Sequence, residues 1–61
     1  MIIEELEKIA DLVEAGRPEE ALRALKAAGR PRGFEGRWYY LHGEAWRLKG
    51  IFDKAIAMYA S

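Results

Sequence analysis

The sequence predicts an all-α protein of four helices, arranged as two antiparallel helix–turn–helix units. Apolar residues recur at intervals of three and four along most of the chain, which is the pattern of one buried helix face. Glycine or proline interrupts this pattern and divides it into segments of helical length. No segment shows the alternation of apolar and polar residues that is typical of a half-buried strand.

The first unit is expected at about 2–29. Its first helix ends near Gly16, because glycine readily adopts the left-handed conformation that closes a helix. Its second helix begins at Pro18, because the N–H that proline lacks would have no partner in the first turn. The residues expected to face inward are Ile2, Leu6, Ile9, Val13, Ala21, Leu22, Leu25 and Ala28.

A loop is expected at 30–36, where a proline and two glycines disfavour regular helix. The second unit follows at about 37–61, with a third helix that ends at Gly50 and a fourth that begins near Phe52. The residues expected to face inward are Trp38, Leu41, Ala45 and Leu48 in the third helix, and Phe52, Ala55, Ile56 and Tyr59 in the fourth.

Size and composition exclude several kinds of site. The chain has 61 residues, and a chain of this length buries only about 60% of its unfolded surface. It has no Cys and one His, so we expect no disulfide, no metal site and no cofactor. The only hydroxyl nucleophile on serine or threonine is Ser61, so we expect no enzyme activity. Association with another surface is the remaining source of stability.

The charges balance over the chain but not within each half. Ten basic and ten acidic residues leave no overall basic field for nucleic acid or anionic lipid. Residues 1–29 hold seven acids against four bases, a net charge of −3, and residues 30–61 hold three acids against six bases, a net charge of +3. Two such chains would attract each other head to tail, although each face could equally be solvated on its own.

The sequence favours a cytoplasmic location. No apolar run approaches the roughly 20 residues that span a bilayer, and the start lacks the basic region and cleavage site of a signal peptide. The chain also has no Asn, Gln or Cys, which is a thermophile tendency that design or chance can also produce.

A shift of 34 residues superposes one unit on the other. Small residues then fall on small residues, and large apolar residues on large ones. The matched pairs are Gly16 and Gly50, Ala21 and Ala55, Leu12 and Trp46, Leu22 and Ile56, and Leu25 and Tyr59. A generic pair of helical hairpins with coincidental spacing is the alternative interpretation.

This period and these residue sizes resemble the tetratricopeptide repeat family. In the second unit the matching residues are Tyr39, Gly43, Trp46, Gly50, Phe52, Ala55 and Tyr59. The departures are His42, where the family prefers Leu; Gly33, where it has a proline; and Glu5, Lys8 and Ile9, where it has an aromatic residue, Leu and Gly. The resemblance covers 39–59 strongly and 12–28 moderately, and it implies a short right-handed α-solenoid.

The resemblance also implies a protein–protein interaction or scaffold function. In the family, the first helix of each unit lines a concave groove that holds a peptide or a partner helix. By position, that groove would be lined by Ile3, Leu6, Ala10, Val13, Arg37, Tyr40, Leu41, Glu44, Arg47 and Leu48. Tyr40 is the best anchor candidate, because Tyr is common at interface hot spots. The alternative is that the apolar members are core residues between helices.

The fourth helix is expected to leave an apolar end uncovered, because repeat arrays need about three units and polar caps for independent stability. The second unit looks truncated, and the residues at its bare end are Phe52, Ile56 and Tyr59. We therefore expect that a second copy of the chain, or the remainder of a longer repeat protein, covers this end.

Two further features of the sequence bear on function. The basic C-terminal half could serve an accessory regulatory or nucleic-acid-associated module, with a cluster of Arg30, Arg32 and Arg37 around Phe34, although solvated loop arginines are the simpler interpretation. His42 and Glu44 could suggest catalysis. Residues two apart on a helix point to different sides, however, so a packed neutral histidine is expected.

Overall fold

The computed structural model describes residues 2–61, and this part of the chain contains four helices and no strand. Their order is α1 (Ile2–Glu14), α2 (Pro18–Ala28), α3 (Glu35–Leu48) and α4 (Phe52–Tyr59). The predictions of an all-helical chain and of four helices are therefore confirmed.

One boundary differs from the prediction. The helix α3 begins at Glu35, two residues before the expected start of the second unit. Glu35 accepts a hydrogen bond from the backbone N–H of Gly33 at 2.9 Å, which folds the loop back onto the first turn of α3. An acidic side chain is also favourable at the positive end of the helix dipole. Gly36 lies within the helix rather than in the loop.

The two turns within the units have the same hydrogen bonds, offset by 34 residues. The N–H of Arg17 bonds to the carbonyl of Leu12 at 2.9 Å, and the N–H of Ile51 bonds to that of Trp46 at 3.0 Å. A hydrogen bond of this kind, from a backbone N–H to the carbonyl five residues earlier, closes a helix when the residue just before the donor has a left-handed conformation. Gly16 and Gly50 occupy that position, with φ of 73° and 77°. The sequence repeat is therefore also a repeat of local structure at the turns.

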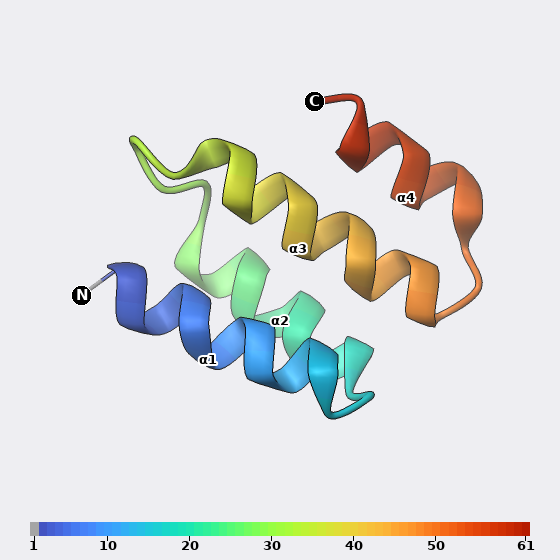
Figure 1. Ribbon diagram of the computed structural model, residues 1–61, viewed down its shortest axis with the longest axis horizontal. Coiled ribbons are helices and arrows are strands. Elements are labelled where there is room, and N and C mark those ends of the chain that lie inside the picture. Colours follow the sequence, from blue (N-terminus) through green and yellow to red (C-terminus); the bar gives the residue numbers. More distant parts are fainter. Residues whose placement is uncertain (1) are drawn as a thin grey trace.

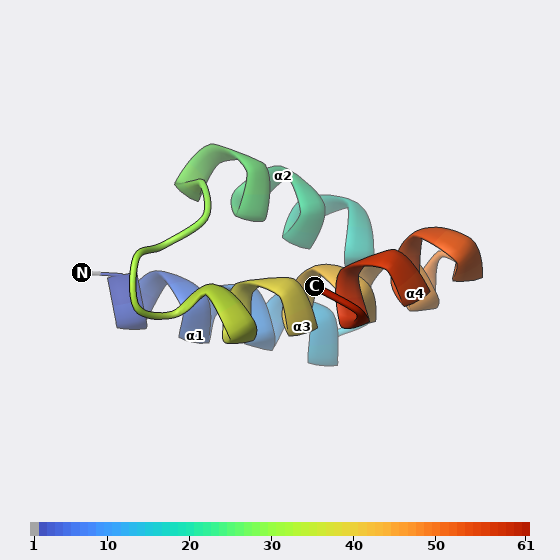
Figure 2. The ribbon, with the colours of Figure 1, turned by 90° about the horizontal axis from the view of Figure 1, so that it is seen from above.

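The helices form one layer of three with a fourth behind it. The helices α1, α3 and α4 lie side by side in that order (Figure 1), and α2 packs behind α1 and α3 (Figure 2). Within the described residues α4 contacts α3 only, and α2 and α4 do not touch. The helices α1, α2 and α3 pack against one another, whereas α4 is added to α3 alone, and a solenoid arrangement stays a proposal.

The core lies between α1, α2 and α3. Ala21, Leu25 and Ala45 have no exposed surface, and the two small alanines allow the helices to approach closely. The full core consists of Leu6, Ile9, Val13, Ala21, Leu25, Leu41 and Ala45. Among the described residues no charged or polar side chain is classed as buried. The fourth helix contributes Ala55, which is 2% exposed, at its contact with α3.

Several residues that were expected to face inward are exposed. Ala28, the last residue of α2, is exposed, whereas Pro31 in the following loop is buried. Leu48 is the last residue of α3 and is 42% exposed. Phe52, Ile56 and Tyr59 are exposed because α4 has a neighbour on one side only. The side chain of Ile2 lies outside the described residues.

Candidate interaction surfaces

The predicted groove is divided by the packing of α1 on α3. Leu6, Val13 and Leu41 belong to the core, at 2%, 9% and 5% exposure, and Ala10 packs against that core. Leu6, Val13 and Leu41 therefore lie between the helices, as in the alternative interpretation of these residues as core, whereas Ala10 is only partly buried. Ile3 at 42% exposure and Arg37 stay on the surface.

The remaining groove residues form a polar and aromatic cluster at the contact of α3 with α4. Arg47 donates to both carboxylate oxygens of Glu44, at 2.9 and 3.3 Å, and the hydroxyl of Tyr59 donates to the same carboxylate. The rings of Tyr40 and Tyr59 lie 6.1 Å apart. Tyr59, which was predicted at the self-association end, therefore contacts Glu44 and Tyr40, which were predicted in the groove.

The electrostatics of this cluster follow from its hydrogen bonds. Donation from Arg47, and then from Tyr59, holds the pKa of Glu44 below its ordinary value. Partial burial, and then the neighbouring Glu44, raise the pKa of Tyr59. The hydrogen bond to Glu44 raises the pKa of Arg47 above its ordinary value, so the ion pair persists at neutral pH.

Gly43 sets how closely α4 approaches α3. A Cβ atom at this position would lie 2.6 Å from Cε1 of Tyr59, which is closer than real Cβ contacts come. The ring of Tyr59 therefore packs directly against the backbone of α3. This is the tight contact that the sequence pattern assigns to this glycine.

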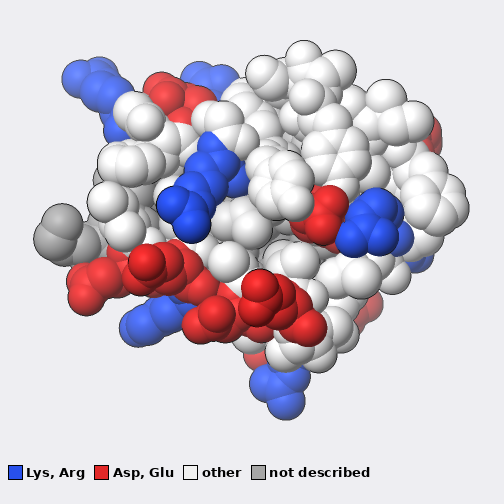
Figure 3. Space-filling model, in the orientation of Figure 1, with Lys and Arg blue, Asp and Glu red and all other residues white. Residues whose placement is uncertain are grey.

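The outer side of α4 is apolar and open to solvent. Phe52, Ile56 and Tyr59 follow at helical spacing on one face, with exposures of 61%, 65% and 43%. Tyr40, at 55%, continues this surface onto α3. We call these four residues the α4 face. Figure 3 shows an uncharged surface over α4, in contrast to the acidic side chains along α1.

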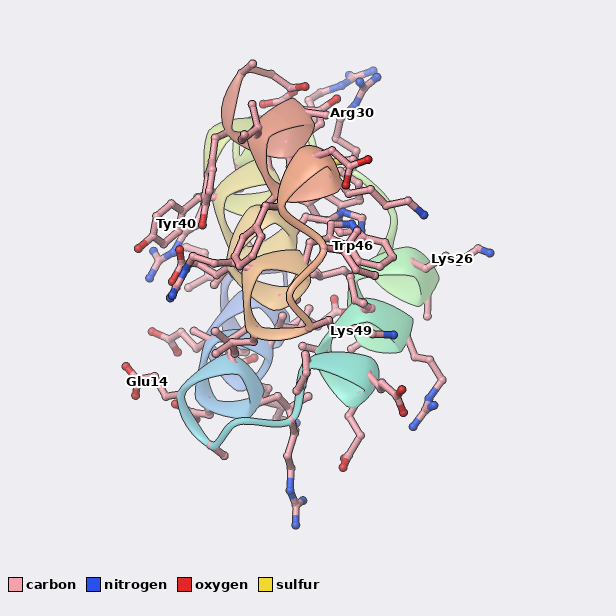
Figure 4. All side chains as sticks on the ribbon, turned by 90° about the vertical axis from the view of Figure 1, so that its right-hand side faces the viewer. Glu14, Lys26, Arg30, Tyr40, Trp46 and Lys49 are labelled. Atoms are coloured by element: carbon pink, nitrogen blue, oxygen red, sulfur yellow. The ribbon has the colours of Figure 1, made fainter. Side chains whose placement is uncertain are left out.

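The opposite side of α3 carries a different surface. Figure 4 shows Tyr40 and Trp46 on opposite sides of the helix, with Trp46 on the side of α2. Trp38, His42 and Trp46 recur every fourth residue and line a hollow of about 470 Å³ between α2 and α3. The remaining lining residues are Leu22, Arg23 and Lys26 of α2. His42 is thus separated from Glu44, whose partners lie at the contact with α4.

The arginine-rich loop lacks a free aromatic ring. Phe34 is partly buried and packs against the core, so it is not available to stack on a base. Arg30 donates to the hydroxyl of Tyr39 at 2.8 Å. Arg32 is exposed. This geometry gives the nucleic-acid hypothesis less support than the sequence did.

Sequence reasoning missed the hollow and the bond of Tyr59 to Glu44. The spacing of Trp38, His42 and Trp46 by four was a usable signal for a shared helix face. Nothing in the sequence indicated that Leu22 and Lys26 would lie opposite them, because that depends on how α2 crosses α3.

Comparisons with known proteins do not identify the chain. No protein-family model, curated protein or solved structure matches it significantly. Within residues 2–61, no three His, Cys, Asp or Glu side chains are grouped to hold a metal ion. In the same part of the chain, no helix has both the length and the hydropathy needed to cross a membrane.

Proposed function

We propose that this chain is a helical protein-interaction module of tetratricopeptide type that pairs with a second copy of itself through the α4 face. The observation that carries the proposal is the exposure of Phe52 and Ile56, at 61% and 65%, on a helix that packs against α3 alone. Contiguous exposed apolar surface of this kind is typical of protein interaction sites.

The repeat resemblance supports the same proposal. Ala21 and Ala55, which the 34-residue shift superposes, are both buried at helix contacts, at 0% and 2% exposure. Gly43, which the resemblance assigns to a tight helix contact, lies directly against the ring of Tyr59. Units of this kind bury their apolar faces by stacking on neighbours, so an uncovered last helix favours association.

The two edges of the layer favour pairing of α4 with α4. Head-to-tail stacking would press the α4 face onto α1, whose outer surface is acidic (Figure 3). That contact would desolvate carboxylates against apolar side chains, which is unfavourable. Two α4 helices bring apolar surface to apolar surface. Each α4 helix carries one acid and one base, Asp53 and Lys54, so the two paired helices themselves have no net charge.

The expected affinity is modest. The exposed parts of Phe52, Ile56 and Tyr59 amount to on the order of 300 Å² per copy, taking roughly 200 Å² for each large side chain. At about 25 cal/mol per Å², burying this surface on both copies stabilises the dimer by roughly 15 kcal/mol. Loss of translational, rotational and side-chain freedom opposes this with about 4–15 kcal/mol. The net gain is then about 0–11 kcal/mol. A value in the middle of this range, about 5.5–8 kcal/mol, corresponds to a dimer with a Kd on the order of 1–100 μM.

Sedimentation velocity between about 1 and 200 μM tests the proposal. We expect the native chain to pass from monomer to dimer across this range and Ile56→Asp to stay monomeric. Ala57→Asp is the matched control, because Ala57 is exposed on α4 but points away from the stripe. It should dimerise like the native chain.

Three results would contradict the proposal. A native chain that is monomeric at 200 μM would exclude pairing of two copies and would leave a different partner for the α4 face. Oligomers that grow steadily with concentration would indicate head-to-tail stacking. Equal effects of Ile56→Asp and Ala57→Asp would place the interface elsewhere.

A further inference from the structure

The hollow between α2 and α3 shares no residue with the α4 face. One of its sides is formed by three aromatic rings of α3 that hold one another in place. The indole N–H of Trp38 donates to the carbonyl of Leu25 at 3.1 Å, which fixes that ring. The ring of His42 meets Trp38 edge-on, with centroids 4.6 Å apart, and lies parallel to Trp46 at 6.3 Å. Three rings of one helix therefore form a continuous ladder whose arrangement exists before any ligand binds.

The ladder is uncharged at neutral pH. Burial lowers the pKa of His42 below its ordinary value, so the neutral imidazole predominates. Its Nδ1 atom is buried and has no hydrogen-bond partner, so it offers no accessible polar group. Leu22 adds aliphatic surface from α2. The floor of the hollow is therefore apolar.

The rim of the hollow is cationic. Arg23 and Lys26 line it from α2, and no carboxylate among the described residues pairs with either of them. Lys54 lies 4.6 Å from the ring centroid of Trp46, and Lys49 lies 5.7 Å from it. Lys49 is the partner of Glu19 at 3.5 Å, which offsets its charge in part. Figure 4 shows Lys26 and Trp46 on the same side of the molecule.

We propose that this hollow binds a small amphipathic anion, with a compact apolar body on the Trp38–His42–Trp46 ladder and one acidic group at Arg23 and Lys26. Two cations without a carboxylate partner, Arg23 and Lys26, beside an apolar floor complement a negative charge attached to a hydrocarbon. Trp38 and Trp46 are eight residues apart, which corresponds to about 12 Å along the helix and suits a short chain or a single ring system. The volume of about 470 Å³ lies within the usual range for small-molecule sites.

Intrinsic fluorescence reads this site directly, because Trp38 and Trp46 are the only tryptophans in the chain. We would titrate octanoate, 1-octanol and octylammonium, which do not absorb at the excitation wavelength, into the native chain and into Ile56→Asp. We expect a saturable emission change with octanoate, at a Kd on the order of a millimolar. Octanol should bind more weakly, by about two- to fivefold, and octylammonium should give no saturable change.

Charge variants separate the acidic group from the apolar body. Lys26→Glu should weaken octanoate about two- to fivefold and leave octanol unchanged. Lys8→Glu is the matched control, because Lys8 is exposed on α1 and does not line the hollow; it should leave both ligands unchanged. Circular dichroism checks that both variants keep their helices.

The proposal is overturned if octanoate causes no saturable change, if octanol binds as tightly as octanoate, or if Lys26→Glu and Lys8→Glu have the same effect. Binding that is equal in the native chain and in Ile56→Asp separates this site from self-association. The two proposals can therefore fail independently.

Discussion

Replacing Gly43 by alanine should detach α4 from α3, although alanine is the better helix former. The added Cβ would lie 2.6 Å from Cε1 and 2.8 Å from Cδ1 of Tyr59. The three nearest atoms all belong to the side chain of Tyr59, so this ring must shift away from its place on α3. Its departure also breaks the bond from its hydroxyl to Glu44.

The opposing effects can be weighed from the structure. Tyr59 is 43% exposed, so somewhat more than half of it is covered. That corresponds to on the order of 100 Å² and, at about 25 cal/mol per Å², to roughly 2.5 kcal/mol. Loss of the hydrogen bond adds about 1 kcal/mol. Alanine returns about 1 kcal/mol of helix propensity. The net expectation is a loss of about 2–3 kcal/mol from the contact between α3 and α4.

Urea unfolding and helical circular dichroism measure this loss, with Gly36→Ala as the matched control. Gly36 is also in α3, and a Cβ atom there would meet nothing within 4 Å. We expect Gly36→Ala to equal or exceed the native stability, by up to about 1 kcal/mol, and Gly43→Ala to lose stability and helix content. If Gly43→Ala is as stable as Gly36→Ala, the close packing of Tyr59 on α3 is not what holds α4.

Three further outcomes are expected. The pKa of Glu44 is lower in the folded than in the unfolded state. Its contribution to folding stability is therefore present above the ordinary value of 4.5 and is lost as the pH falls through the folded-state pKa. Between pH 6 and pH 3, the urea midpoint should fall less in Glu44→Gln than in the native chain. Ala21→Leu should cost about 1–3 kcal/mol in urea unfolding because Ala21 has no exposed surface, whereas Ala27→Leu, at an exposed position of α2, should be nearly neutral. Trp38→Phe should lower the melting temperature, because it removes the bond to Leu25 and leaves that carbonyl without its indole partner; an unchanged melting temperature would show that the bond adds no stability.

The helices could be predicted from the sequence because their signals are local. The apolar spacing gave their faces, and Gly16 and Gly50 gave their ends, since the left-handed position that closes each turn suits glycine best. The start of α3 could not be read in the same way. It depends on the bond between Glu35 and the backbone of Gly33, which exists only once the loop has folded.

The surfaces were harder to predict, because exposure depends on which helices are neighbours. Leu41 and Leu48 have the same apolar character and lie one heptad apart, yet one is in the core and the other is 42% exposed. The pattern also could not show that α4 would touch α3 alone. That arrangement leaves Ile56 open to solvent and separates the α4 face from the hollow beside α2.

The most direct test of the central claim, the pairing of α4 with α4, is site-specific cross-linking. The chain has no Cys, so Ile56→Cys and Lys8→Cys each introduce a single thiol, on α4 and α1 respectively. With a short bifunctional maleimide, pairing of two α4 helices predicts that Ile56→Cys alone forms covalent dimers and that Lys8→Cys alone does not. A dimer that forms only when the two variants are mixed would show that α4 docks on α1 and would contradict the account.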